Sequence, residues 1–294
     1  MRVFRGVEYS LQPLARLPAA GPQPLCDTES MTIVLIAVVS YLFATGWLMI
    51  AADHQGTAST RGWLIPANLA LLLHGLTHYL AWHASGVTDL HFFAALSLVG
   101  LGMSTLTAVV GASGRMRALG VVVFPLSALA LMMYALYGHA TQPEPLDWRL
   151  LLHAWLALLA YATLAVAAVL AVFLWLQERA LRRREFHRWL RALPPLTELE
   201  MLLFRTIAVG FVLLGATLLT GVLFVDNLLA QHLVHKTVLS VLSWLAFGAL
   251  LLGRWRLGWR GAVAVRWTLA AMALLVLAFF GSKFVLELVL HRPS

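Results

Sequence analysis

The chain contains little charge. Asp, Glu, Lys and Arg together make up 12% of its 294 residues, whereas soluble domains typically carry about a quarter. Hydrophobic residues account for 61%, and the mean hydropathy is +0.84. This composition excludes a pair of ordinary soluble domains. It predicts a single polytopic domain embedded in a membrane.

Several functional classes are excluded by what the sequence lacks. The single cysteine, Cys26, rules out an internal disulfide framework, a CxxC redox pair and a zinc–cysteine cluster. Walker loops, HExxH and GxSxG motifs are missing, and carboxylates are nearly absent from the apolar segments. The scarcity of carboxylates argues against an ion-coupled transporter. Because no nucleophile or base-orienter pair is recognisable, we favour a binding protein over an enzyme.

Apolar runs long enough to cross a bilayer, about 20 residues each, dominate what remains. We expect an all-α, polytopic membrane helix bundle of about eight transmembrane helices. The expected spans are 32–52, 63–83, 92–111, 117–138, 149–177, 204–225, 235–253 and 264–290.

Lys and Arg predict the orientation of these spans, because cytoplasmic loops are enriched in both. Alternation of the spans puts fourteen such residues on one side and four on the other. The rich side includes the run Arg179–Arg191, and the poor side has Arg149, Lys236, Lys283 and Arg292. Both ends of the chain are therefore expected outside the cytoplasm.

Residues 1–30 form a polar, Pro-rich tail with no continuous apolar run, unlike a conventional signal peptide. The three arginines of this tail would lie on the arginine-poor side. Two explanations remain open: a genuine outer tail, or translation that starts at Met31. Residues 31–294 are expected to form the single membrane domain.

The segment from Gln177 to Glu200 is the only sizeable non-membrane piece between spans. Its arginines, Arg179–Arg191, are expected to continue the fifth helix into the headgroups and bind anionic lipid, which we favour over a nucleic-acid surface. Pro194-Pro195 is expected to stop that helix, and Thr197-x-x-Glu200 to form a capping box for the next.

Eleven histidines stand out in this apolar chain, and most gather on the arginine-poor side. An imidazole in or beside hydrocarbon is costly unless it is paired or ligated, and neutral imidazole ligates iron, zinc or copper. His153 lies near the outer start of the fifth span. His74, mid-span, and His78, one turn away, could ligate a metal or act as hydrogen-bonded glue between helices.

Particular stretches resemble a known family. Leu152-His153-Ala154-Trp155 with Ala160-Tyr161-Ala162, the run Lys236 to Trp244, and Phe280-Gly281-Ser282-Lys283 are similar to signatures of the cytochrome c assembly proteins. Leu193-Pro194-Pro195-Leu196 resembles the short, YpjD-like branch of this CcsA/CcmC/HemX-type family. The resemblance covers about residues 60–290.

The resemblance implies a multi-pass protein of the bacterial inner membrane that handles haem at its outer face. It makes His153 and His291 the candidate axial ligands of haem iron, with Lys283 or Arg292 near a propionate. His74 is a further candidate ligand within the membrane. Lys283 could instead be neutralised by Glu287, one turn away.

The chain also departs from the family pattern. The expected tryptophan-rich segment is replaced by residues 228–235, which contain neither tryptophan nor aspartate. His235 could partly replace the lost groups. We therefore expect an accessory or regulatory haem handler, with cytochrome c maturation proteins as partners, rather than a full haem lyase. The alternative is a cofactor-free membrane partner or channel-like protein whose histidines serve packing.

Overall fold

A computed structural model describes residues 28–53, 61–112, 116–138, 147–184, 193–224 and 231–281. All regular elements in these ranges are helical. They are α1 (Thr28–Asp53), α2 (Leu64–Ser85), α3 (Phe92–Ala112), α4 (Ala118–Tyr137), α5 (Trp148–Arg183), α6 (Leu196–Phe224), α7 (Gln231–Leu257), α8 (Gly261–Val276) and a π-helical turn, η2 (Leu277–Gly281).

The expected all-α membrane bundle is confirmed. The described residues contain eight helices that are long and apolar enough to cross a membrane, one for each predicted span. Many large apolar side chains point outward, such as Val39 at 63% and Val212 at 67% exposure. A soluble protein would bury such residues, whereas a bilayer solvates them.

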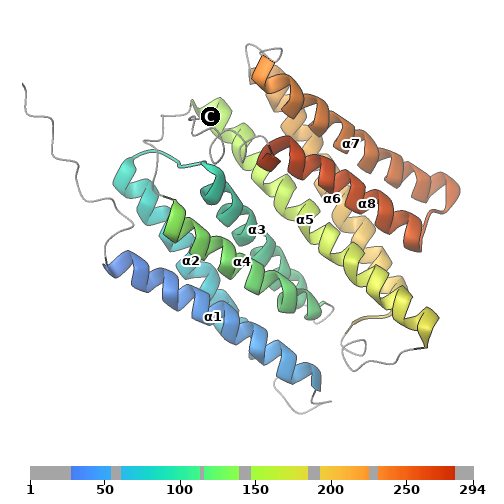
Figure 1. The fold of residues 1–294 in the computed structure, drawn as a ribbon, viewed down its shortest axis with the longest axis horizontal. Helices are drawn as coiled ribbons and strands as arrows, with labels where there is room; N and C mark the ends of the chain where they lie inside the picture. Colours follow the sequence, from blue (N-terminus) through green and yellow to red (C-terminus); the bar gives the residue numbers. More distant parts are fainter. Residues whose placement is uncertain are drawn as a thin grey trace, which may run out of the picture.

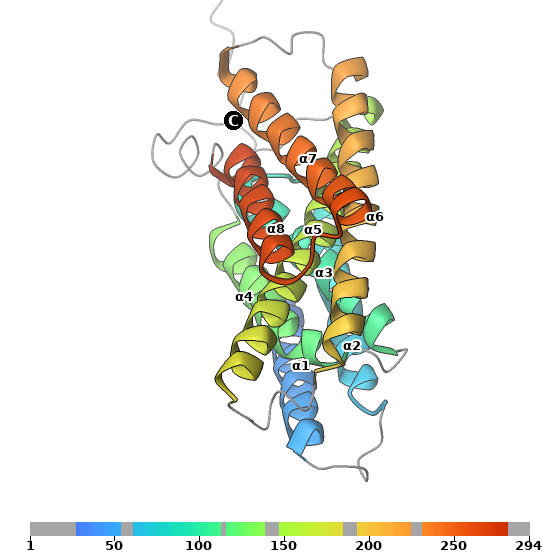
Figure 2. The ribbon, with the colours of Figure 1, turned by 90° about the vertical axis from the view of Figure 1, so that its right-hand side faces the viewer.

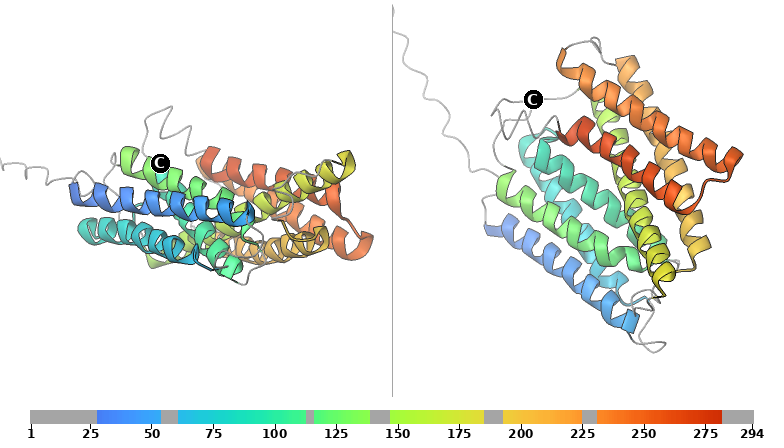
Figure 3. Two further views of the ribbon diagram at one scale, coloured as in Figure 1. Left: turned by 90° about the horizontal axis from the view of Figure 1, so that it is seen from below. Right: turned by 45° about the vertical axis from the view of Figure 1, so that its right-hand side comes forward.

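The helices form two groups that meet at α5 (Figure 1). In the first group, α1 packs against α2 and α4, and α3 packs against α4. In the second group, α5 packs against α6 and α8, and α7 packs against α8 and α6. Helix α5 also contacts α3 and so joins the two groups, which Figures 2 and 3 show from other sides.

Consecutive helices run antiparallel, so their connections alternate between the two ends of the bundle (Figure 1). One end, here called the arginine-rich end, holds all but two of the described Lys and Arg residues; the exceptions are Arg149 and Lys236. The helical arrangement therefore places the basic residues as the sequence predicted. That this end faces the cytoplasm stays a prediction.

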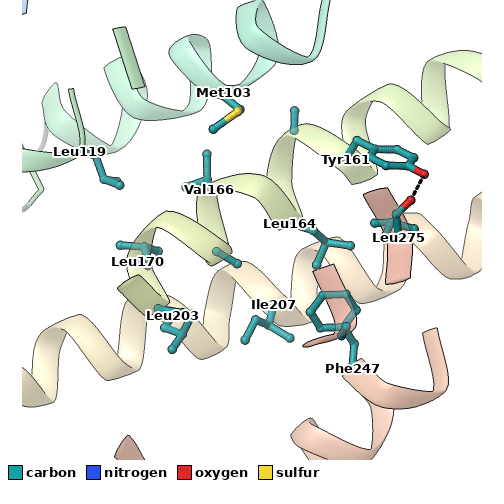
Figure 4. Packing of buried hydrophobic residues seen from close by; sticks show 14 of the residues in the cluster. Met103, Leu119, Tyr161, Leu164, Val166, Leu170, Leu203, Ile207, Phe247 and Leu275 are labelled. Carbon is teal, nitrogen blue, oxygen red and sulfur yellow. Dashed lines mark hydrogen bonds between the residues drawn. The ribbon is translucent and has the colours of Figure 1, made fainter. Parts of the chain in front are cut away.

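The largest apolar core surrounds α5 (Figure 4). Leu164 and Leu170 of α5 are fully buried in this core, which also contains Ile207 of α6, Phe247 of α7 and Met103 of α3. Small residues permit this close packing: a Cβ added to Gly210 of α6 would lie 2.5 Å from the Leu164 side chain. Helix α5 is consequently the helix that packs against both groups.

Two local predictions are wrong. Helix α5 ends at Arg183, well before Pro194, because Arg184 adopts a left-handed conformation (φ 56°) whose N–H closes the helix. The capping box is not formed either. Helix α6 already begins at Leu196, and the Glu200 carboxylate accepts a hydrogen bond from the Gly261 N–H at 2.9 Å instead. Glu200 therefore pairs with the Gly261 N–H at the α7–α8 turn and not with a backbone N–H at the start of its own helix.

Tyr161 links α5 to α8. Its hydroxyl donates to the Leu275 carbonyl at 2.6 Å, next to the point where α8 changes into the π-helical turn (Figure 4). π-Helical turns leave backbone groups out of the regular helical pattern, so an added donor is useful there. The tyrosine of the Ala-Tyr-Ala stretch therefore connects α5 to the end of α8.

Replacing Tyr161 by phenylalanine is expected to destabilise the bundle by about 1 kcal/mol, the typical net value of one hydrogen bond. Thermal unfolding in mild detergent measures the loss. Tyr137→Phe, at an exposed tyrosine at the end of α4, is the matched control and is expected to leave the midpoint unchanged. Equal midpoints for both variants would mean that the Leu275 contact contributes nothing.

Candidate histidine sites

His153 lies between α5 and α6 at the end of the bundle opposite the arginine-rich end. It is half-buried, a turn and a half into α5, and its Nδ1 lies 3.1 Å from the Thr220 hydroxyl of α6. A Cβ added to Gly221 would lie 3.2 Å from the His153 ring, so this glycine lets the imidazole pack closely on α6. The His153 ring thus lies against the Thr220 hydroxyl and the Gly221 backbone of α6.

The Thr220 contact decides which nitrogen of His153 carries the proton. The Thr220 hydroxyl donates to the backbone carbonyls of Ala216 and Thr217, at 3.0 and 2.9 Å. The hydroxyl has a single hydrogen, and when this hydrogen points at a carbonyl, the oxygen accepts from the His153 Nδ1–H. The lone pair of the neutral ring then resides on Nε2, which is the form that ligates a metal.

Aromatic and basic groups flank His153. Trp148 of α5 packs against Phe224 of α6, with ring centroids 6.1 Å apart, and the Arg149 guanidinium lies 5.7 Å from the Trp148 ring. The start of α5 and the end of α6, opposite the arginine-rich end, therefore offer an imidazole, apolar rings and a cation at neighbouring positions. Tryptophan also collects at membrane interfaces generally, so the aromatic rings alone indicate little.

His74 has a different environment. It is fully buried in α2, and both of its ring nitrogens have partners: Nδ1 lies 3.1 Å from the Tyr41 hydroxyl of α1, and Nε2 lies 2.9 Å from the Ser97 hydroxyl of α3. His74 therefore joins three helices. A metal could reach either nitrogen only after one of these hydrogen bonds breaks.

The Ser97 hydroxyl is shared by two histidines, because His78 Nε2 also lies 3.0 Å from it. A hydroxyl has one hydrogen, so Ser97 donates to one imidazole and accepts from the other. The hydrogen bonds from Tyr41 through His74 and Ser97 to His78 consequently form one directional chain. Such fully paired networks add specificity to helix packing within an apolar core.

Stacked rings extend this cluster towards the end of the bundle. His78 stacks on Tyr134 of α4 at 4.6 Å, and His91, just before α3, stacks on Tyr134 at 5.9 Å. His91 Nδ1 in turn pairs with the Asp89 carboxylate at 2.7 Å. His74, His78 and His91 thus share one structural cluster, separate from His153.

Other predicted site residues cannot be placed. His291, Lys283 and Arg292 lie outside the described residues. His235 is the fifth residue of α7, but only its backbone is described. Among the described residues, no group of three or more His, Cys, Asp or Glu side chains could hold a metal ion. A metal bound by His153 would thus need its remaining ligands from a cofactor or from undescribed residues.

Sequence reasoning missed the partners of these histidines. Thr220 and Ser97 are ordinary polar residues in apolar helices, and Tyr41 looks like a core aromatic. A signal was present for Thr220 alone: it precedes Gly221, so a small residue and a hydroxyl adjoin in one helix. Which helix they face is a matter of tertiary packing.

Known proteins resemble this chain over most of its length. The family described as Cytochrome C assembly protein matches residues 62–290. The inner membrane protein YpjD of Escherichia coli K12 is 30% identical over 259 residues, which cover 87% of this chain and 98% of that protein. Protein HemX of Brevibacillus brevis is 28% identical over 134 residues, which cover 45% of this chain and 49% of HemX. No solved structure matches.

Proposed function

Since the chain belongs to the cytochrome c assembly protein family, we propose that it binds haem in the bacterial inner membrane as an accessory or regulatory factor of cytochrome maturation. The inner-membrane assignment rests on the eight apolar helices and on the relative YpjD, whose name gives that location. The family provides the cofactor class, and the histidines provide candidate ligands.

The observation that carries this proposal is the state of His153. Haem supplies an iron whose axial position accepts a neutral imidazole nitrogen. His153 meets that requirement, because Thr220 accepts its Nδ1–H and leaves the Nε2 lone pair for the metal. Arg149, one turn away on α5, is a cation at the same end that could pair with a propionate. The residues present therefore fit the cofactor.

We assign different tasks to the other predicted residues. His291 would be a second ligand of the haem iron, Lys283 would pair with a propionate, and His235 would be a further haem contact. His74 is the weaker ligand candidate, because Tyr41 and Ser97 occupy both of its nitrogens. For His74 we propose a structural role in the group formed by α1–α4.

An absorption spectrum of the full chain, purified in mild detergent from haem-replete cells, tests the proposal. We expect a Soret band with the spectrum of a histidine-ligated haem. Colourless protein would contradict haem binding and would favour the cofactor-free alternative. That alternative further predicts that deletion lowers the stability of a membrane partner while cellular cytochrome c content stays normal.

Replacing Thr220 by valine is expected to weaken haem binding by about 10- to 100-fold, the usual cost of losing the group that orients a metal-bound histidine. Valine keeps the shape of threonine but cannot accept the His153 Nδ1–H. The affinity is measured by haem titration, and the reduction potential of the bound haem provides a second readout that a purely structural role would not shift.

Thr220→Ser is the matched control, since serine retains the accepting hydroxyl. We expect it to bind haem nearly as tightly as the unmodified chain, with an unchanged potential. If Thr220→Val and Thr220→Ser behave alike in both measurements, Thr220 does not orient the ligand.

A further inference from the structure

A pocket unrelated to the histidines lies at the arginine-rich end, between the start of α6 and the turn that joins α7 to α8. Its volume is about 680 Å³. The residues that line it are Thr197, Glu198, Met201, Phe204, Arg205, Ala208, Arg254 and Arg260. Three guanidinium groups therefore converge on one cavity at the boundary of the apolar helices.

Two of these arginines lie close to a buried carboxylate. The Glu200 carboxylate, only 7% exposed, lies 3.9 Å from Arg254 and 3.5 Å from Arg260, and it also accepts the Gly261 N–H. Arg254 further lies 4.8 Å from the Phe204 ring centre and donates to the Trp259 carbonyl. The Arg254 guanidinium is thus held in place without a ligand, which lowers the entropic cost of binding one, whereas the Arg260 side chain is largely exposed.

The charges of the lining residues do not cancel. Arg205, Arg254 and Arg260 line the pocket with one carboxylate, Glu198, whereas the carboxylates of Glu200 and Glu178 lie behind it, at Gly261. The lining therefore has an excess of positive charge, which favours an anionic group such as a phosphodiester. The Thr197 hydroxyl in the first turn of α6 adds a hydrogen-bond donor. We propose that this pocket binds the phosphate group of an anionic phospholipid.

The surface beyond the pocket favours a lipid over a soluble phosphate compound. Met201, Arg205, Ala208 and Val212 follow one another at helical spacing, so they share one face of α6. Met201 and Val212 are 45% and 67% exposed. An apolar stripe therefore runs from the pocket towards the middle of the membrane, where an acyl chain can lie while its phosphate meets the arginines. Basic pockets between transmembrane helices bind anionic headgroups in this manner.

The test is a titration of the purified, delipidated full chain in nonionic detergent with phosphatidylglycerol, phosphatidylcholine or inorganic phosphate, followed by native mass spectrometry. We expect phosphatidylglycerol to bind more tightly than phosphatidylcholine. Arg205→Gln should weaken phosphatidylglycerol binding about fivefold, the effect of one basic charge near a lipid headgroup. Glu198→Gln should strengthen it, because it removes a negative charge from the pocket.

Arg266→Gln is the matched control, since Arg266 is an exposed arginine near the same end, on α8, that does not line the pocket. Its binding should equal that of the unmodified chain, and thermal unfolding checks that all variants are folded. If inorganic phosphate binds and the same substitutions change its affinity in the same way, the pocket is a phosphate site whose ligand is a soluble phosphate compound and not a lipid. Equal effects of Arg205→Gln and Arg266→Gln, or no preference for phosphatidylglycerol over phosphatidylcholine, would overturn the proposal.

Discussion

Replacing His153 by alanine is expected to lower the haem affinity more than about 100-fold, so that the purified variant lacks a Soret band. The loss should exceed that of Thr220→Val, because removing a ligand costs more than removing the group that orients it. The bundle should remain folded, since His153 is only half-buried and alanine is a good helix former. The measurement is the ratio of haem to protein after purification.

Two further variants make this result specific. His83→Ala removes an exposed imidazole at the end of α2, on the same side of the bundle, and should retain haem. His153→Gly leaves space for free imidazole, which should restore the Soret band when added at millimolar concentration. A normal haem content in His153→Ala would refute the assignment of His153 as a ligand.

Replacing His74 by leucine is expected to destabilise the chain by about 2–4 kcal/mol, because buried polar groups that lose their partners each cost about 1–3 kcal/mol. The Tyr41 hydroxyl would lose its hydrogen bond with His74, and Ser97 would keep only His78. Unfolding of the purified protein by increasing amounts of a denaturing detergent measures the change in the free energy of unfolding. Haem content per folded chain should stay normal.

A double-mutant cycle with Ser97→Ala separates the network from simple packing. If His74 and Ser97 act through their shared hydrogen bond, the two substitutions together should cost less than the sum of the two alone. The opposite pattern for His74→Leu, with unchanged stability and no bound haem, would make His74 a cofactor ligand and contradict its structural role.

The eight helices could be predicted from the sequence because the physical cause is local. An apolar run of about 20 residues has to form a helix in hydrocarbon, where each backbone group needs an internal partner. The concentration of arginine at one end follows from the same alternation. Helix ends were less predictable: Arg184 closes α5 by its backbone conformation, and no Gly or Pro at that position signals it.

The partners of the histidines could not be predicted, because they depend on how helices pack. The spacing of His74 and His78 shows that they share a helical face, but not that Ser97 of α3 lies between them. Likewise, Glu200 was expected to cap α6, while the α7–α8 turn supplies Gly261, Arg254 and Arg260 as its partners. Local rules fail here because burial favours the tertiary partner.

The pairing of His153 with His291 stays a prediction, since His291 lies outside the described residues. The same holds for Lys283 near a propionate. What the described residues add is a difference between the two imidazoles: Thr220 contacts His153 at Nδ1, which leaves Nε2 for the proposed ligation, whereas both nitrogens of His74 have hydrogen-bond partners. Haem binding is therefore expected to depend on His153 more than on any other described residue.

Titration of the haem-free chain with ferric haem tests the central claim most directly. Our account predicts that the Soret change saturates at one haem per chain and that the low-spin spectrum is typical of imidazole ligation. A linear rise without saturation, equal to that of detergent micelles alone, would show that haem only partitions into the apolar phase, and the account would be contradicted.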